Sequence, residues 1–166
     1  MINNMLFLAR TEQVDAAIHR QEIDLAETVE QLGDYFEGVA EEQQMRVVSE
    51  ASGSLHADPD LLRRALANLI ANALRYGATG TEVRVSCERT ADNVVITVEN
   101  SGEPIAAEHL PRLFDRFYRC DPSRAQPGDS GGLGLAIVRS IMQLHGGEVR
   151  VTSDAAITCF SLSFPR

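Results

Sequence analysis

The chain lacks any run of apolar residues that approaches the roughly 20 needed to span a membrane. Residues 1–10 are too few, and lack the basic start, for a secretory signal peptide. Cysteine is scarce, with Cys87, Cys120 and Cys159 scattered and no CxxC pair, so reduced thiols are expected rather than a disulfide framework. These absences favour a cytoplasmic protein. The sequence also shows no internal repeat.

Positive charge is in short supply as well. The net charge of −9 argues against broad nucleic-acid binding. An anionic ligand would therefore need local basic groups, for which the candidates are Arg75, Arg116, Arg119 and Arg124. A length of 166 residues with 44% hydrophobic content suits one compact domain plus a short appendage.

Hydrophobic periodicity predicts the secondary structure. Helices are expected over residues 2–12, 24–42, 59–76 and 132–145. Strands are expected over 45–50, 54–57, 81–89, 94–99, 148–153 and 158–164. Residues 13–23 read as a linker and 101–131 as loop with one or two helical turns. This order predicts an α+β fold, with helices layered on one face of a mixed, mostly antiparallel sheet.

One predicted helix carries two asparagines on a single side. Asp58 as N-cap and Pro59 mark its start, and Gly77 is a natural C′ residue at its end. Asn68 and Asn72 are four residues apart and therefore share one stripe. Asparagine is a poor residue within a helix, and an amide oxygen suits Mg²⁺. The alternative is that both amides are solvated or bonded to a neighbouring loop.

A glycine cluster precedes another predicted helix. Gly131, Gly132 and Gly134 allow positive φ and the close approach of a ligand. The helix that follows presents unpaired N–H groups and a partial positive charge at its start, which together favour a phosphate site. The alternative is that these glycines only shape a turn.

Four blocks together resemble the ATP-binding domain of sensor histidine kinases. They are NLIANALRY at 68–76, VENSGEPI at 98–105, FDRFYR at 114–119 and GLGLAIV at 132–138. They are similar to that family's N box, first glycine box, F box and second glycine box, in order and spacing. The resemblance implies the Bergerat-type two-layer α/β sandwich of gyrase, mismatch-repair and heat-shock-chaperone ATPases. Residues 98–106 and 108–124 look like the copper- and silver-sensing subfamily.

The resemblance also implies a domain division and a setting. Residues 1–20 would be the tail of the second dimerisation helix with its linker, and residues 21–166 the catalytic ATP-binding domain. The partners would be ATP or ADP, the dimerisation domain of the same receptor, and through it a response regulator. The full-length protein would be a membrane-bound homodimer, with this part on the cytoplasmic side of the inner membrane, soluble and able to be monomeric.

The implied roles follow position by position. Asn72 would hold Mg²⁺ and, with Arg75 at the phosphates, act in catalysis. Asn68 would support Asn72, and Tyr76 would pack on the adenine or ribose. Phe114, Phe117 and Tyr118 would anchor an ATP lid running through about Gly131, mobile without nucleotide and ordered by it. The remaining implied nucleotide-binding residues are Asn100, Gly102, Ile105, Arg119, Gly131, Gly132, Leu133, Gly134, Leu135 and Thr158.

The sequence departs from the family pattern in its first glycine box. Asn100 stands where the family usually has aspartate, and Pro104 where it has a second glycine. An amide oxygen accepts a hydrogen bond more weakly than a carboxylate does, so adenine recognition should persist at lower affinity. Ile157 with Thr158 replaces the family's Gly-Thr.

Asn68 separates kinase from ATPase within this superfamily. The ATPase members carry a glutamate at this position to activate water, whereas an amide takes up no proton at neutral pH. The site is therefore expected to pass the γ-phosphoryl group to an external nucleophile. An anti-sigma-type Ser/Thr kinase and a non-catalytic ATP-gated interaction module remain open alternatives.

The family's acceptor histidine is followed by an acidic residue that serves as its base. His19, His56, His109 and His145 are followed instead by Arg, Ala, Leu and Gly. Each therefore reads as a surface or helix-end residue. We expect this chain to bind ATP without phosphorylating itself, with the acceptor on a dimerisation helix that precedes it.

Overall fold

The structure, a computed structural model, describes residues 2–11, 17–119 and 133–166. Its helices are α1 (Ile2–Thr11), α2 (Leu25–Glu42), α3 (Pro59–Tyr76) and α4 (Gly134–Leu144), with a 3₁₀ turn at Leu110–Arg112. Its strands are β1 (Gln21–Asp24), β2 (Arg46–Glu50), β3 (Ser54–Ala57), β4 (Glu82–Arg89), β5 (Asn93–Ser101), β6 (Glu148–Asp154) and β7 (Ile157–Pro165).

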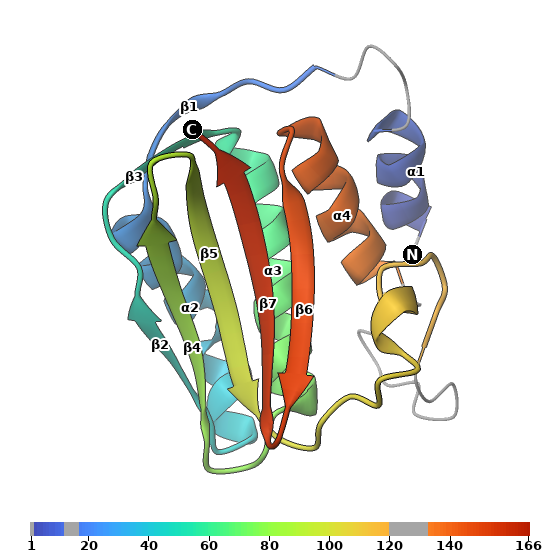
Figure 1. The fold of residues 1–166 in the computed structure, drawn as a ribbon. Coiled ribbons are helices and arrows are strands. Elements are labelled where there is room, and N and C mark those ends of the chain that lie inside the picture. The colour runs from blue at the N-terminus through green and yellow to red at the C-terminus, as the bar shows by residue number, and fades with distance from the viewer. Residues whose placement is uncertain (1, 12–16, 120–132) are drawn as a thin grey trace.

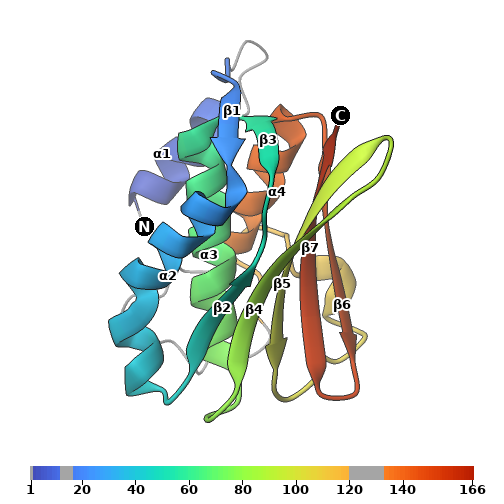
Figure 2. The ribbon, with the colours of Figure 1, turned by 90° about the vertical axis from the view of Figure 1, so that its left-hand side faces the viewer.

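The main sheet has five strands in the order β2-β4-β5-β7-β6, and only the β2–β4 pair is parallel. Figure 1 and Figure 2 show the helices on one face of this sheet, and no helix of the described residues covers its other face. The expected fold class, α+β with helices on one face of a mixed sheet, is confirmed.

The core lies between the sheet and helices α2, α3 and α4. Every second residue of β5 and β7 is buried, because successive side chains of a strand point to opposite faces. The buried stripe of α3 faces them, and it consists of Leu62, Ala65, Leu66, Leu69, Ile70, Ala73 and Leu74. This packing holds α3 rigidly and so sets the position of its polar stripe.

The N-terminal helix α1 packs against α4. Leu8 is only 1% exposed, and the Arg64 guanidinium lies 4.0 Å from the centre of the Phe7 ring. Arg64 Nη2 also donates a hydrogen bond to Asn4 Oδ1 at 3.1 Å. The division of the chain at residue 20 stays a prediction.

The linker prediction for residues 13–23 is wrong at its end. Residues 21–23 belong to β1, which pairs antiparallel with β3 from Gln21 opposite Ala57 to Asp24 opposite Ser54. Only Ile23 in this strand is buried, so its single apolar residue carries too weak a pattern to predict a strand. Each residue of β1 pairs with a residue at least 30 positions further along the chain, as Asp24 with Ser54 shows, and only the tertiary structure brings the two strands together.

At the two ends of α3, the sequence predicted the residues correctly, but for Gly77 it gave the wrong physical reason. The predicted N-cap of α3 is present, since Asp58 Oδ1 accepts from the backbone N–H groups of Asp60 and Leu61. Gly77 does follow α3, but its φ of −71° is not left-handed. A Cβ there would lie 2.4 Å from Met45 Cε and 2.7 Å from the Ala73 carbonyl oxygen. Close packing therefore requires this glycine.

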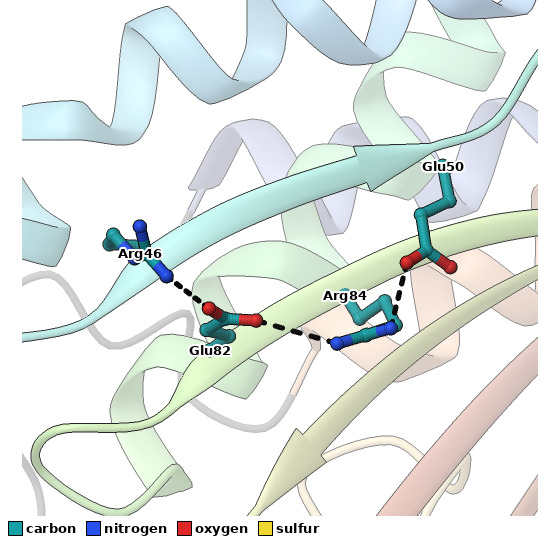
Figure 3. A network of polar contacts seen from close by, with 4 residues as sticks. All are labelled: Arg46, Glu50, Glu82 and Arg84. Carbon is teal, nitrogen blue, oxygen red and sulfur yellow. Dashed lines mark hydrogen bonds and ion pairs between the residues drawn. The ribbon is translucent and has the colours of Figure 1, made fainter.

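The parallel β2–β4 pair carries a chain of ion pairs on its exposed side. Arg46 bonds to Glu82, and Arg84 contacts both Glu50 at 2.7 Å and Glu82 at 3.5 Å (Figure 3). Exposed pairs of this kind are worth at most about 1 kcal/mol each. These ion pairs help to fix the register of β2 against β4, and they contribute little to the free energy of unfolding.

A buried histidine joins the end of α4 to the start of α3. His145 is 5% exposed, and its Nδ1 lies 2.8 Å from the Ile141 carbonyl oxygen. Nδ1 therefore carries the proton, and Nε2 accepts from the backbone N–H of Asp58 at 3.0 Å. The interpretation of His145 as a helix-end residue is confirmed, because it is the C-cap of α4.

The stability of the fold is expected to fall as the pH drops below about 6.5. Burial lowers the pKa of His145, with Arg20 adding to the shift, while the Ile141 carbonyl and Asp58 partly oppose it. Below 6.5 the unfolded chain binds a proton that the folded chain refuses. Urea unfolding at pH 7.5 and 5.5 measures the loss. This loss of unfolding free energy should be smaller in His145→Gln. It should persist in His56→Gln, where an exposed histidine is replaced. Equal losses in both variants would contradict the assignment of the effect to His145.

Candidate nucleotide site

The asparagine stripe of α3 lies beside the start of α4. Asn68 Nδ2 donates a hydrogen bond to the Gly134 carbonyl oxygen at 3.2 Å. Asn72, one turn further along α3, is half-buried, and within the described residues its side-chain amide makes no hydrogen bond. The structure thus brings Asn68 to Gly134 and leaves the Asn72 amide available to a ligand.

A second pair of site residues meets across β5 and β7. Asn100 lies opposite Thr158 in the strand register, and each is 5% exposed. Thr158 Oγ1 lies 2.9 Å from Ser153 Oγ, which accepts from the backbone N–H of Ile105 at 2.8 Å. The sheet therefore gathers Asn100, Ile105 and Thr158. Sequence reasoning missed Ser153, whose inward place in β6 carries no distinctive signal.

The amide of Asn100 combines burial with unused hydrogen-bonding capacity. Within the described part of the chain it makes no side-chain hydrogen bond, yet no fully buried side-chain polar atom there lacks a partner. Its amide atoms must therefore retain some contact with solvent. A buried residue with an accessible, unbonded amide is a natural point for hydrogen bonding to a ligand.

The end of α3 approaches the end of β5 at Gly102. A Cβ on Gly102 would lie 2.7 Å from the Tyr76 carbonyl oxygen. The Ala78 N–H donates to the Ser101 carbonyl at 2.7 Å, which holds the two segments together. Tyr76 itself is 54% exposed, and its neighbour Arg75 is half-buried. Tyr76 and Gly102 thus meet at one end of the sheet.

The residues of the predicted second glycine box have different surroundings at the start of α4. Leu133 is fully buried and Leu135 is half-buried against the core, so both anchor the helix. Gly134 is the first helical residue, and it is absent from the described glycines with positive φ. The part of Gly134 in a phosphate site stays a prediction. Gly131, Gly132, Arg124 and most of the predicted lid lie outside the described residues.

The segment before the lid is fastened at several points. The rings of Phe114 and Phe160 meet edge to face, with 6.1 Å between centroids. His109 Nδ1 bonds to the Tyr118 hydroxyl, and the Arg112 guanidinium lies 4.6 Å from the centre of the Tyr118 ring. Tyr118 thus contacts His109 and Arg112. The role of His109 was not expected from sequence, where it read as a surface or helix-end residue.

Phe117 stands out in this segment for its backbone. Its φ is +64°, and its side chain is 53% exposed. A left-handed conformation at a bulky residue costs of order 1–3 kcal/mol and persists only where the surroundings impose it. Here Asp115 bridges Arg112 and Arg139 of α4, which ties the segment to that helix. Arg119 follows directly and is half-buried.

The side chains of the site suit a metal ion that is held chiefly by phosphate oxygens and water, with few protein ligands. No group of three or more His, Cys, Asp or Glu residues able to bind a metal occurs in the part of the chain that the structure describes. The Asn72 amide oxygen is a hard neutral donor. Mg²⁺ accepts one such donor readily when phosphates and water complete its octahedron.

Comparison with known proteins agrees with this arrangement. The family of histidine kinase-, DNA gyrase B- and HSP90-like ATPases matches residues 57–166. This chain belongs to that family.

Individual relatives extend the likeness to the whole chain. The chain is 47% identical to sensor histidine kinase CusS of Escherichia coli K12 over 167 residues, covering 99% of this chain and 35% of that protein. It is 42% identical to sensor protein IrlS of Burkholderia pseudomallei, covering 99% of this chain and 36% of IrlS. The chain therefore spans about a third of the length of these relatives. In the part of the chain that the structure describes, no helix is long and apolar enough to cross a bilayer.

Solved structures share the fold. The Acinetobacter baumannii histidine kinase AdeS superposes with a TM-score of 0.84 at 22% identity, covering 99% of this chain and 76% of that chain. Full-length ShkA in complex with AMPPNP superposes with a TM-score of 0.86 at 22% identity, covering 99% of this chain and 35% of that one.

Proposed function

We propose that this chain binds Mg-ATP between α3, α4 and the ends of β5 and β7, and presents the γ-phosphoryl group to a histidine on the dimerisation domain of the same receptor. The observation that carries this proposal is the hydrogen bond from Asn68 Nδ2 to the Gly134 carbonyl oxygen. It holds a neutral amide where a water-activating base would be needed for hydrolysis. Phosphoryl transfer then proceeds by positioning and charge neutralisation.

The roles of the residues follow from their places. The accessible amide of Asn100 hydrogen-bonds the adenine, with Thr158, Ile105 and Gly102 around it. Tyr76 packs on the adenine or ribose. Arg75 and Arg119 contribute positive charge near the phosphates, because the planar guanidinium group of arginine suits phosphate oxygens. The start of α4, from Gly131 to Leu135, receives the phosphates.

Asn72 is proposed as the protein's ligand to Mg²⁺. The ion would neutralise charge on the transferring phosphoryl group. Asn72 positions it, and Asn68, fixed to Gly134, keeps the two helices at a constant separation. The AMPPNP complex of the structural neighbour ShkA supports a nucleotide in this fold.

The setting is also proposed. The relatives of this chain are named as sensor kinases and sensor proteins, so a response regulator would receive the phosphoryl group from the dimerisation domain. The resemblance of residues 98–106 and 108–124 to copper and silver sensors supports a metal response. We propose that the whole receptor is a homodimer of the inner membrane, with the part described here in the cytoplasm.

Incubation with labelled ATP tests the proposed reaction. We expect no stable label on this chain alone, because its histidines lack an acidic neighbour, and acid-labile label on an added dimerisation domain of the same receptor. A variant of that domain with the acceptor histidine replaced by glutamine is the control. Acid-stable label would favour a Ser/Thr kinase, and nucleotide binding without any transfer would favour an interaction module. Either result would overturn the proposal.

A further inference from the structure

An open cleft of about 520 Å³ lies at the end of the sheet where the chain terminates. Its apolar floor includes Leu55, Val94 and Phe164, each no more than 5% exposed. Arg20, Arg89 and Arg166 surround this floor. Among the described residues, no aspartate or glutamate lines the cleft. The volume falls within the range of small-molecule sites.

The three arginines differ from most others in this acidic protein. Elsewhere the described arginines commonly face carboxylates, as in the pairs formed by Arg46, Arg63, Arg84, Arg112, Arg139 and Arg150. Within the described residues, Arg20, Arg89 and Arg166 form no ion pair. Their guanidinium groups gather around one cleft and pair with no aspartate or glutamate side chain of the described residues, although the chain carries a net charge of −9.

Two of these cations are held in place by neutral groups. Arg89 donates to the carbonyl oxygens of Ser54 at 2.6 Å and Ser52 at 2.7 Å. Gly53 makes room for it, since a Cβ there would lie 2.4 Å from Arg89 Nη2. Arg166 donates to the Thr90 carbonyl oxygen at 2.8 Å. Carbonyl groups orient a guanidinium without cancelling its charge, so both remain able to attract an anion.

Arg20 adds a cation that is free to turn toward a ligand. It makes no hydrogen bond among the described residues, and its positive charge contributes to the lowered pKa of His145, which also lines the cleft. That influence indicates that the guanidinium stands within electrostatic range of the cleft wall. A bound anion would lose little by displacing water from this side chain.

The cleft is distinct from the nucleotide site. His145 at the end of α4 lines the cleft, whereas Gly134 at the start of α4 contacts Asn68. With a rise of 1.5 Å per residue, the two ends of this helix lie about 16 Å apart. None of the proposed nucleotide-binding residues lines the cleft.

We propose that this cleft binds a small organic anion, with a phosphate or carboxylate head on Arg20, Arg89 and Arg166 and an apolar body on Leu55, Val94 and Phe164. Arginine is suited to such heads because its planar group donates in pairs to their oxygens. The apolar floor would add affinity by removing the body of the ligand from water.

Titration of the ¹⁵N-labelled chain with phenyl phosphate tests the proposal. Saturable shifts are expected for the backbone amides of Ser54, Arg89 and Arg166. Inorganic phosphate supplies only the head of this ligand and phenol only its body. Each should therefore bind at least about tenfold more weakly than phenyl phosphate does. Benzoate should shift the same amides, since it shares the chemistry.

Arg20→Gln should weaken phenyl phosphate binding about tenfold, because a charged donor is lost without loss of any internal bond. Arg46→Gln is the matched control, since it removes the same charge from the far end of β2 and should leave the affinity unchanged. Equal affinity of Arg20→Gln and the parent would overturn the proposal. So would equal losses in both variants, or shifts confined to Asn72 and Gly102.

Discussion

Replacing Asn72 with alanine is expected to weaken Mg-ATP binding by about tenfold to a hundredfold while leaving the fold intact. Asn72 is half-buried on α3, and its amide makes no hydrogen bond within the described residues, so its removal breaks no bond of the folded chain. Alanine is also the better helix former. The substitution should therefore lower the affinity for Mg-ATP and not the stability of the fold. The expected loss has the size that is typical when residues around a metal ion are changed.

Calorimetry with and without Mg²⁺ measures this effect. The parent should bind ATP more tightly when Mg²⁺ is present, and the variant should lose most of that difference. Gln143→Ala is the matched control, because it removes an exposed amide from the other end of α4. Equal Mg-ATP affinity in Asn72→Ala and the parent would remove Asn72 as the metal ligand. Asn68→Ala should show a smaller loss, through its bond to Gly134.

Replacing Gly102 with alanine is expected to lower the free energy of unfolding by about 1–3 kcal/mol and to weaken ATP binding as well. The new Cβ would lie 2.7 Å from the Tyr76 carbonyl oxygen and 3.4 Å from the Ala78 backbone nitrogen. Both neighbours belong to the backbone, so the end of α3 must move away from β5. That movement shifts Tyr76 relative to Asn100, which lies two residues before Gly102.

Gly38→Ala is the matched control for this prediction. Gly38 lies within α2, and a Cβ there would meet nothing within 4 Å. The change should therefore stabilise the fold by up to about 1 kcal/mol, through helix propensity alone. Urea unfolding and ATP titration of both variants provide the measurement. If Gly102→Ala were as stable as the parent, the close approach of α3 and β5 would not be needed for the fold.

Helices α2 and α3 show where sequence reasoning succeeds. Each has an aspartate cap and a regular apolar stripe, and these local signals predicted their bounds closely. The longer strands were predicted for the same reason, because alternation in β5 and β7 is complete over their length. Strand β1 was missed since its four residues include one buried side chain, and its stability depends on β3.

The candidate site was predicted in part. The residue types of the asparagine stripe and the glycine boxes pointed to nucleotide chemistry, and family comparison agrees at the level of the domain. The individual roles remain predictions. Ser153 and the His109–Tyr118 contact had no sequence signal, because each depends on segments that meet only after folding. The reason offered for Gly77 was also local, and its close packing against Met45 and the Ala73 carbonyl oxygen replaced that reason.

The sequence by itself determined the order of the helices and of every strand except β1, the fold class and the chemical character of the site. These depend on periodicity, capping and residue type, which act over a few neighbouring positions. The tertiary structure alone decided which polar groups meet. Asn68 reaches Gly134, His145 accepts from Asp58, and the unpaired arginines surround one cleft. These contacts join positions distant in the chain, and only the packing of α3, α4 and the sheet sets their geometry.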